Sequence, residues 1–222
     1  MSYHLGIDTS NYTTSVALYN DEDNSIVNLK QLLPVKSGEK GIRQSDAVFH
    51  HTKAYAELSE SVLSSYSGEI KAVGASVTPT TQEGSYMPCF LVGENAARTV
   101  ASALNVPFYS FSHQQGHIAA ALYSAKRTDL LDKKFLAFHI SGGTSQALLV
   151  NPNDKYFDTI KISDSLDLKA GQAIDRTGVM LGLDFPCGKH LEKLSNNADK
   201  IIKYKGAYYY ERKSCISLFR WS

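Results

Sequence analysis

The sequence has few cysteines, no long apolar run and almost no net charge. Cys89, Cys187 and Cys215 are widely spaced and form no CxxC pair, which argues against a disulfide framework or a zinc ribbon. No apolar stretch approaches the ~18 residues that a membrane-spanning helix needs. A formal net charge of +1 creates no strong overall field, so charge alone does not indicate a nucleic-acid-binding protein.

The N-terminus lacks the basic region and apolar stretch of a signal peptide, because a strand-like run begins shortly after Met1. We therefore expect a cytoplasmic protein with no membrane partner. Of the 222 residues, 43% are hydrophobic and 20% are charged, a balance typical of a folded chain with a sizeable core. The length suits one large domain or two small ones.

Apolar periodicity predicts the same order of three strands and a helix twice along the chain. The first set consists of strands at residues 3–8, 14–19 and 26–33 and an amphipathic helix around residues 47–62. The elements that follow it are a strand at 70–77, a helix at 90–104, a strand at 106–111 and a helix at 113–124. The second set consists of strands at 135–140, 146–150 and 156–162, a helix at 169–183 and a short helix after Gly188.

The repeated order predicts two related α/β lobes, at residues 1–132 and 133–222, of which the second is incomplete. Each lobe has a turn rich in small polar residues after its first strand. Two such turns facing one another would form a cleft in which backbone N–H groups bind phosphates. Sugar kinases, actin and Hsp70 are built in this way.

Three short motifs could carry chemistry, and each also has an ordinary structural explanation. The turns Gly6–Thr14 and Ser141–Ser145 suit phosphate contacts, but hairpin turns commonly contain the same residue types. His113 and His117 share one face of a predicted helix, as two ligands of one metal ion would. Chance pairs at this spacing are not rare among seven histidines. The pair is not HExxH, because Gln114 replaces the glutamate, so a zincin-type peptidase would lack its general base.

A fourth motif joins Asp175 to Gly188. Asp175 lies on a predicted helix face and Gly188 begins the next helix, so together they could hold a ribose and approach a nucleotide. The ordinary alternative is a solvated Asp175–Arg176 helix face followed by a helix-start glycine. Spacing alone favours that alternative.

Taken together and in order, the four motifs resemble the TsaD/Gcp family, also labelled O-sialoglycoprotein endopeptidase or peptidase family M22. The resemblance covers about residues 5–194, most of the chain. It implies an α/β fold with two lobes, of the actin/Hsp70/sugar-kinase-like (ribonuclease H-like) type. It also implies the family's activity, which is transfer of a threonylcarbamoyl group from threonylcarbamoyl-AMP to an adenosine beside the tRNA anticodon.

The resemblance also implies roles for particular residues. His113 and His117 match the family's metal-binding histidines, and His139 falls where other members place a tyrosine near the metal. These three are the candidate ligands of one divalent ion, iron or zinc. His51 matches a family histidine at the cleft. The candidate residues for binding ATP or an adenylate are His139, Ile140, Ser141, Gly142, Gly143, Asp175 and Gly188, with Ser10 of the first turn.

Three family carboxylates are replaced by neutral residues. Thr13 stands for a glutamate of the first turn, Gln115 for a glutamate between the two histidines, and Gln172 for a glutamate before the ribose aspartate. Threonine and glutamine cannot act as general acids or bases at neutral pH. The sequence therefore puts the activity of this chain in question and assigns no catalytic residue.

The match to the family pattern fades after Leu194, and residues 208–222 do not follow it. Family members continue further, with an asparagine that contacts adenosine and an aspartate that binds the metal. We interpret this end as a frameshift or a premature stop. One wall of the nucleotide site would then be absent, so ATP or an adenylate is expected to bind weakly. An incomplete second lobe would also expose apolar surface and favour a homo-oligomer.

Two functions of different class remain open on the sequence. One is a threonylcarbamoyltransferase-like enzyme, whose partners would be tRNA and a family-type protein. The other is a non-catalytic paralogue that binds nucleotide or metal and acts through a protein partner. A peptidase ranks behind both.

Overall fold

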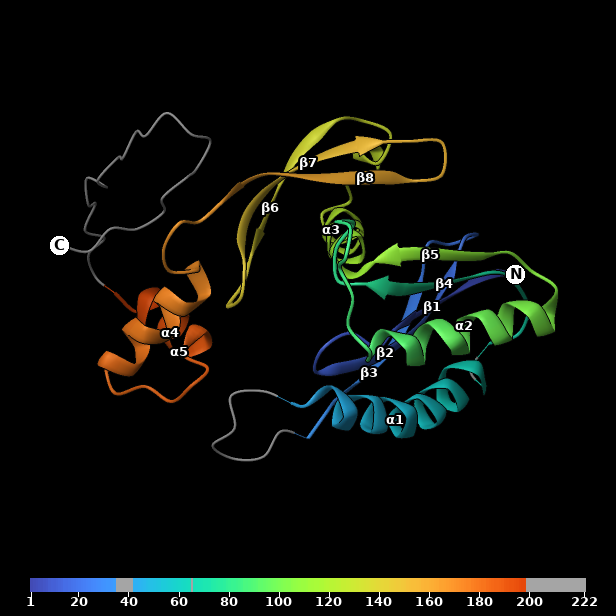
Figure 1. Cartoon of the computed structure of the whole chain (residues 1–222), viewed down its shortest axis with the longest axis horizontal. Helices are drawn as coiled ribbons and strands as arrows, with labels where there is room; N and C mark the ends of the chain where they lie inside the picture. The colour runs from blue at the N-terminus through green and yellow to red at the C-terminus, as the bar shows by residue number, and fades with distance from the viewer. Residues whose placement is uncertain (35–41, 65, 199–222) are drawn as a thin grey trace. The chain divides into compact units, whose positions relative to one another are not determined.

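The computed structural model describes residues 1–34, 42–64 and 66–198. The chain divides into two compact units, Met1–Arg127 and Thr128–Ser222 (Figure 1). This division falls close to the predicted boundary at 132/133, and the assignment of each unit to a family lobe stays a prediction. The predictions for residues 208–222, including a frameshift near the end, lie outside the described residues.

The first unit is built on a five-stranded sheet in the order β3-β2-β1-β4-β5. Its strands are β1 (Ser2–Asp8), β2 (Thr13–Asn20), β3 (Ile26–Leu32), β4 (Glu69–Thr78) and β5 (Phe108–Ser112). The first three strands form an antiparallel meander, whereas β4 pairs parallel to β1 and β5 pairs parallel to β4. Three antiparallel strands followed by two parallel ones are the arrangement of the ribonuclease H-like fold. The predicted fold class is therefore confirmed.

Helices α1 (Gln44–Ser64) and α2 (Phe90–Leu104) cover one face of this sheet. Helix α1 contacts β2 and β3, α2 contacts β1 and β4, and the two helices contact each other. Alternate residues of the strands point at these helices, as the two-residue period of a strand requires. The buried cluster between sheet and helices comprises Leu5, Ile7, Val16, Leu18, Val62, Ile70, Val73, Ala75, Ala97 and Ala101.

Helix α3 (His113–Ser124) begins directly after β5, at the residue that the sequence predicts. Ser112 is its N-cap, and the Ser112 hydroxyl accepts a hydrogen bond from the N–H of Gln115 (3.2 Å). In return, Gln115 Oε1 accepts a hydrogen bond from the N–H of Ser112 (2.7 Å). This reciprocal capping box satisfies helix N–H groups that have no partner within the helix. It fixes His113 in the first turn of the helix.

The second unit repeats the predicted order of three strands and a helix. Strands β6 (Phe135–Ile140), β7 (Ser145–Pro152) and β8 (Phe157–Asp164) form an antiparallel sheet in the order β6-β7-β8. A short 3-10 helix, η1 (Thr128–Leu130), precedes them, and helices α4 (Ala170–Met180) and α5 (Gly188–Asn196) follow. In the residues that the structure describes, β6 pairs on one side only, whereas β1 has a strand on both sides.

Helix α4 ends at Met180, earlier than the predicted end at residue 183. Gly182 has a φ of +76°, a left-handed conformation that commonly terminates a helix. The N–H of Leu183 folds back onto the carbonyl of Gly178 (3.0 Å). Among residues 1–34, 42–64 and 66–198, no helix has the length and apolar character needed to cross a membrane.

We predict that Ser112→Ala will destabilise the first unit. The substitution removes the side-chain acceptor of the N-cap, which typically costs about 1 kcal/mol. Urea unfolding should show the loss as a lower transition midpoint. Ser110→Ala, at an exposed position of the same strand, is the matched control and should change the unfolding free energy by less than about 0.5 kcal/mol. Equal midpoints for the two variants would contradict the capping role.

Candidate functional site

The candidate site of the first unit lies where β1 and β4 end. Parallel strands bring their carboxyl ends to the same sheet edge, and this edge is where open α/β sheets bind ligands. Asp8 ends β1, and its Oδ2 accepts hydrogen bonds from Ser76 Oγ of β4 (2.5 Å) and from His113 Nδ1 (2.9 Å). Oδ1 accepts from the N–H of Ser10 (2.8 Å) and also from the Ser10 hydroxyl. Asp8 therefore joins β1, β4 and α3.

The turn after β1 is fixed by Thr9. This fully buried residue donates its hydroxyl to the carbonyl of Cys89 (2.9 Å) and accepts from the N–H of Gly93 (3.0 Å). A Cβ on Gly93 would lie 2.9 Å from Thr9 Oγ1, so a side chain there would force the turn and α2 apart. The backbone at Asp8 is thus held against α2.

The Asp8 carboxylate is held in its charged form. Burial raises the pKa of this carboxyl. Hydrogen bonds from His113, Ser10 and Ser76, together with the charge of His113, lower it by more, so the net pKa lies below the ordinary aspartate range. The side chain is 27% exposed. A persistent negative charge next to an imidazole favours the tautomer whose Nδ1 carries the proton.

His113 and His117 converge at their outer ring nitrogens. The two Nε2 atoms lie 2.8 Å apart and the ring centroids 4.3 Å apart. In the neutral form of His113, Nδ1–H donates to Asp8, so Nε2 is unprotonated and accepts a hydrogen bond from His117 Nε2–H. His117 is exposed, so the pair is open to solvent. The arrangement matches the carboxylate–histidine–metal pattern, in which a carboxylate orients the ligating ring.

His139, the predicted third metal ligand, is a half-buried residue of β6 in the second unit and pairs with Gln146 in the sheet register. Its place beside His113 and His117 stays a prediction. Within the described part of the chain, no group of three or more His, Cys, Asp or Glu residues has the geometry of a metal site. The structure thus brings together two of the three predicted ligands.

His51 is fully buried on α1, away from solvent. Its Nδ1 lies 2.8 Å from the Thr14 hydroxyl, while its Nε2 has no hydrogen-bond partner. Burial lowers its pKa, an effect that the Asn11 carbonyl and the charge of Asp8 only partly offset. His51 is therefore neutral at physiological pH and connects α1 to the first turn.

In the second unit, the turn between β6 and β7 is closed by Ser141. The Ser141 hydroxyl lies 2.7 Å from Thr144 Oγ1 and accepts from the N–H groups of Gly143 (3.3 Å) and Thr144 (3.1 Å). These N–H groups are those that the sequence assigns to phosphate binding. A phosphate would have to replace the two long hydrogen bonds to Ser141. Ile140, next to the turn, is 54% exposed.

Helix α4 begins against this turn. The N–H of Gly171 donates to the carbonyl of Ser141 (3.1 Å), and the N–H of Ala170 donates to Ser145 Oγ (2.9 Å). A Cβ on Gly171 would lie 2.6 Å from the backbone nitrogen of Gly142, a distance that no side chain tolerates. Glycine at 171 is therefore required for the close approach of the helix to the turn.

Asp175 and Gly188 lie at the other end of this helical segment. Asp175 Oδ1 accepts from the N–H of Cys187 (2.9 Å), so the carboxylate already ties α4 to the start of α5. A Cβ on Gly188 would meet no heavy atom within 4 Å, so packing within the protein does not require glycine there. Ribose binding by Asp175 stays a prediction. The hydrogen bond to Cys187 gives Asp175 a structural role as well.

Asp8 and Ser76 are site residues for which sequence reasoning gave no individual role. They are 68 positions apart, and each resembles an ordinary strand-end polar residue by itself. The available signal was their place at the ends of two strands predicted to precede polar loops. Gln115 stands for a family glutamate in the sequence, but its structural role is different. It is 2% exposed and serves as the N3 residue of a capping box. A glutamine fills that role as well as a glutamate does.

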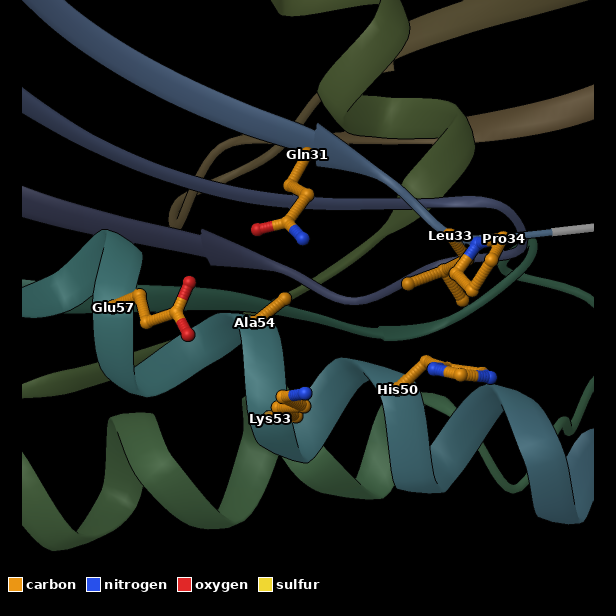
Figure 2. A pocket seen from close by; sticks show the side chains of 7 residues that line it. All are labelled: Gln31, Leu33, Pro34, His50, Lys53, Ala54 and Glu57. Atoms are coloured by element: carbon orange, nitrogen blue, oxygen red, sulfur yellow. The ribbon is translucent and has the colours of Figure 1, made fainter.

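A small cavity of about 200 Å³ lies elsewhere in the first unit, between α1 and the segment that ends β3. In Figure 2, Gln31 points from β3 toward α1, and His50, Lys53 and Glu57 lie along the helix. The cavity is lined by none of the residues that the sequence assigns to metal or nucleotide.

A ribonuclease H-like sheet with a histidine pair at its carboxyl edge defines the chain as a two-unit α/β protein of the actin-like class. The family model of TsaD, tRNA N6-adenosine threonylcarbamoyltransferase, matches residues 26–216. The chain belongs to this family.

Three solved structures show low similarity to the chain. YeaZ from Pseudomonas aeruginosa is 15% identical (TM-score 0.44), with 72% of this chain and 65% of that chain covered. EutJ from Carboxydothermus hydrogenoformans is 14% identical (TM-score 0.43; 86% and 61% covered). A ROK family transcriptional regulator, homologous to the E. coli MLC protein, is 11% identical (TM-score 0.47; 85% and 52% covered). The chain thus spans less than two thirds of the length of each.

One further charged cluster supports the second unit. Asp164, at the end of β8, accepts from Lys169 Nζ (2.8 Å) and Gln146 Nε2 (3.1 Å). The hydrogen bond from Lys169 is the main cause of a pKa lowered to about 2. Lys169 directly precedes α4, so this pair helps to anchor the helix beside the turn.

We predict that Asp164→Asn will lower the urea midpoint of the second unit at pH 7. The carboxylate stabilises the fold above its unfolded-state pKa of about 3.9, and this contribution disappears as pH falls through the folded pKa of about 2. The difference from wild type should therefore shrink between pH 4 and pH 2. Asp158→Asn, at an exposed position of the same strand, is the control. A difference that is independent of pH would argue against the ion pair.

Proposed function

We propose that this protein is a divalent-metal-binding member of the threonylcarbamoyltransferase family that acts on a threonylcarbamoyl adenylate and tRNA. The observation that carries the proposal is the convergence of His113 Nε2 and His117 Nε2 at 2.8 Å, backed by the Asp8 carboxylate. Two imidazole nitrogens at one solvent-accessible point, once the proton between them is lost, are a donor set that zinc and iron accept. A third protein ligand, which we assign to His139, and water would complete the coordination.

The residues around the pair have distinct roles in this proposal. Asp8 holds the His113 ring and its tautomer, and Ser10 and Ser76 hold Asp8. His117 would have to release the Nε2 proton that it donates to His113 before that nitrogen could bind a metal. A bound divalent ion would supply the positive charge that polarises a carbonyl or phosphoryl oxygen.

The adenylate would bind along the Ser141–Gly143 turn, with Asp175 and Gly188 at its ribose and base. Support for this position comes from the exposure of the turn and from the weak bonds that its N–H groups make to Ser141. Binding is expected to be weak, because those hydrogen bonds must be exchanged. Calorimetry with a non-hydrolysable adenylate should give a dissociation constant above about 1 μM.

The second candidate function is a non-catalytic paralogue that binds metal or nucleotide and acts through a protein partner. Thr13 and Gln172 favour it, because both replace family carboxylates and neither carries an acid function. Gln115 does not favour it, since that residue caps α3. Incubation with threonylcarbamoyl-AMP and tRNA, followed by nucleoside analysis, separates the two functions. Metal binding without modified nucleoside would select the paralogue.

We predict that zinc binding depends on the histidine pair and on Asp8. His117→Ala should abolish calorimetric binding of Zn²⁺ to the first unit of the full chain. Asp8→Asn should weaken binding by about 10–100-fold, the usual effect of losing a carboxylate behind a ligating histidine. His190→Ala, at an exposed histidine of α5, is the matched control and should bind as wild type does.

Circular dichroism establishes that each variant is folded before binding is compared. Wild-type affinity in His113→Ala and His117→Ala would refute the metal site. Loss of binding in His117→Ala together with unchanged binding in Asp8→Asn would refute only the orienting role of the carboxylate.

A further inference from the structure

His51 of α1 is completely buried, and one of its two ring nitrogens has no partner. Its Nδ1 lies 2.8 Å from the Thr14 hydroxyl, whereas Nε2 has no hydrogen-bond partner among the residues that the structure describes. A neutral imidazole carries one N–H and an imidazolium carries two. Protonation would therefore bury a positive charge together with a donor that lacks an acceptor, and both are unfavourable away from water.

The groups around His51 offset this cost only in part. Burial lowers the pKa of His51, the Asn11 carbonyl and the charge of Asp8 raise it by less, and the charge of His50 on the same helix lowers it. The Asn11 carbonyl makes no hydrogen bond to Nε2. The closed structure thus holds the neutral form of His51.

Helix α1 packs on β2, β3 and α2, and the described residues of these elements bring no further compensating charge to His51. Strand β2 contains no charged residue. Lys30, the only charged residue of β3, follows a core-packed leucine and so faces the opposite side of the sheet. On α2, Glu94 and Arg98 pair with each other (2.9 Å). The Cys89 thiol before α2 is neutral, because burial raises its pKa.

The first half of α1 is held by fewer apolar contacts than the second half. The buried residues of its apolar cluster are Leu33, Ala47, Cys89 and Phe90. Val62, in the second half, belongs to the larger cluster between the sheet and the helices. The cavity of about 200 Å³ also borders the first half, at His50 and Ala54 (Figure 2). A segment with few buried apolar contacts opens at a lower free energy than the core does.

The same part of α1 supports the turn of the candidate site. Gln44 Oε1 accepts a hydrogen bond from the N–H of Cys89 (3.3 Å), and the Cys89 carbonyl accepts one from the Thr9 hydroxyl (2.9 Å). Thr9 follows Asp8 directly, and the buried Thr14 lies just after the turn. Loss of the contact between His51 and Thr14 would therefore loosen the turn on the side that faces the helix.

We propose that proton uptake by His51 releases residues 44–54 of α1 from the first turn, so that this part of the unit opens reversibly in mild acid. The proton comes from solvent and adds to the ring nitrogen that carries none in the neutral form. The imidazolium finds water as an acceptor only after the helix has moved away. The opened state uncovers Cys89 and frees the Thr14 hydroxyl. Neither the metal nor the adenylate takes part in this step.

The direction of the pH effect follows from the lowered pKa of His51 in the closed state. Above the ordinary histidine pKa of about 6.5, His51 is neutral in both states and does not favour opening. Below it, the opened state binds a proton that the closed state does not bind. The opening equilibrium constant should therefore rise about tenfold between about pH 7.5 and pH 5.5.

The test is the rate at which Cys89 reacts in the full chain. This thiol is fully buried, so labelling requires opening. A pyridyl disulfide, which reacts with thiols even in acid, is added at each pH, and mass spectrometry locates the label. Each rate is divided by the rate in the urea-unfolded chain at the same pH. The ratio for Cys89 should rise about tenfold from about pH 7.5 to pH 5.5, and the ratio for Cys187, buried in the second unit, should stay constant.

Two neutral replacements assign the effect to His51. His51→Asn keeps an amide near the position of Nδ1 for Thr14, and His51→Gln keeps more of the side-chain volume. Neither side chain takes up a proton, so the Cys89 ratio should become independent of pH in both, whatever its absolute value. His50→Asn, at the half-buried neighbour on the same helix, is the matched control and should keep the rise of wild type. Circular dichroism at both pH values establishes that each variant is folded.

A Cys89 ratio that is constant with pH in wild type would overturn the proposal. So would a rise that both His51 variants keep, or one that His50→Asn abolishes, because another group would then be responsible. If neither His51 variant folds, NMR of the histidine ring nitrogens in wild type decides. A His51 ring that is neutral at about pH 5.5 in the closed chain supports the proposal, and one that titrates near 6.5 without any opening overturns it.

Discussion

The Asp8 carboxylate is the point on which the first unit's site depends. It ends the central strand of the sheet and is the common acceptor for Ser76 of the neighbouring strand and His113 of the following helix. A charge placed there is acceptable only because several donors surround it, since an unpaired carboxylate at this depth would be strongly unfavourable. The same donors are thereby held at the edge where parallel strands end. Removing the charge would release a serine, a histidine and a turn together.

Much of the fold followed from periodicity and from helix caps. Helix α3 was placed correctly because Ser112 is a strong cap, and the meander of β1 to β3 followed from alternation of apolar residues. The end of α4 was missed because the left-handed conformation of Gly182 overrides an apolar pattern that continues to Leu183. In this chain the local sequence signal located the start of α3 better than it located the end of α4. Helix ends are commonly uncertain by one or two residues.

The site was less accessible from sequence than the fold. Spacing on one helix brought His113 and His117 together, because helical geometry alone sets their separation. No local rule connects Asp8 to Ser76 or to His113, which lie 68 and 105 positions away. Gln115 was interpreted only as a lost carboxylate. Ser112 and Gln115 have the three-residue spacing of a capping box, which is a local signal that was missed.

The contact between Gly171 and Gly142 has a mechanical consequence for the second unit. No side chain lies between these two backbones, so no change of rotamer can absorb a displacement. A shift of one backbone therefore displaces the other. The turn after β6 and the root of α4 therefore move as one rigid joint. A methyl group at position 171 would force the turn after β6 and the start of α4 apart.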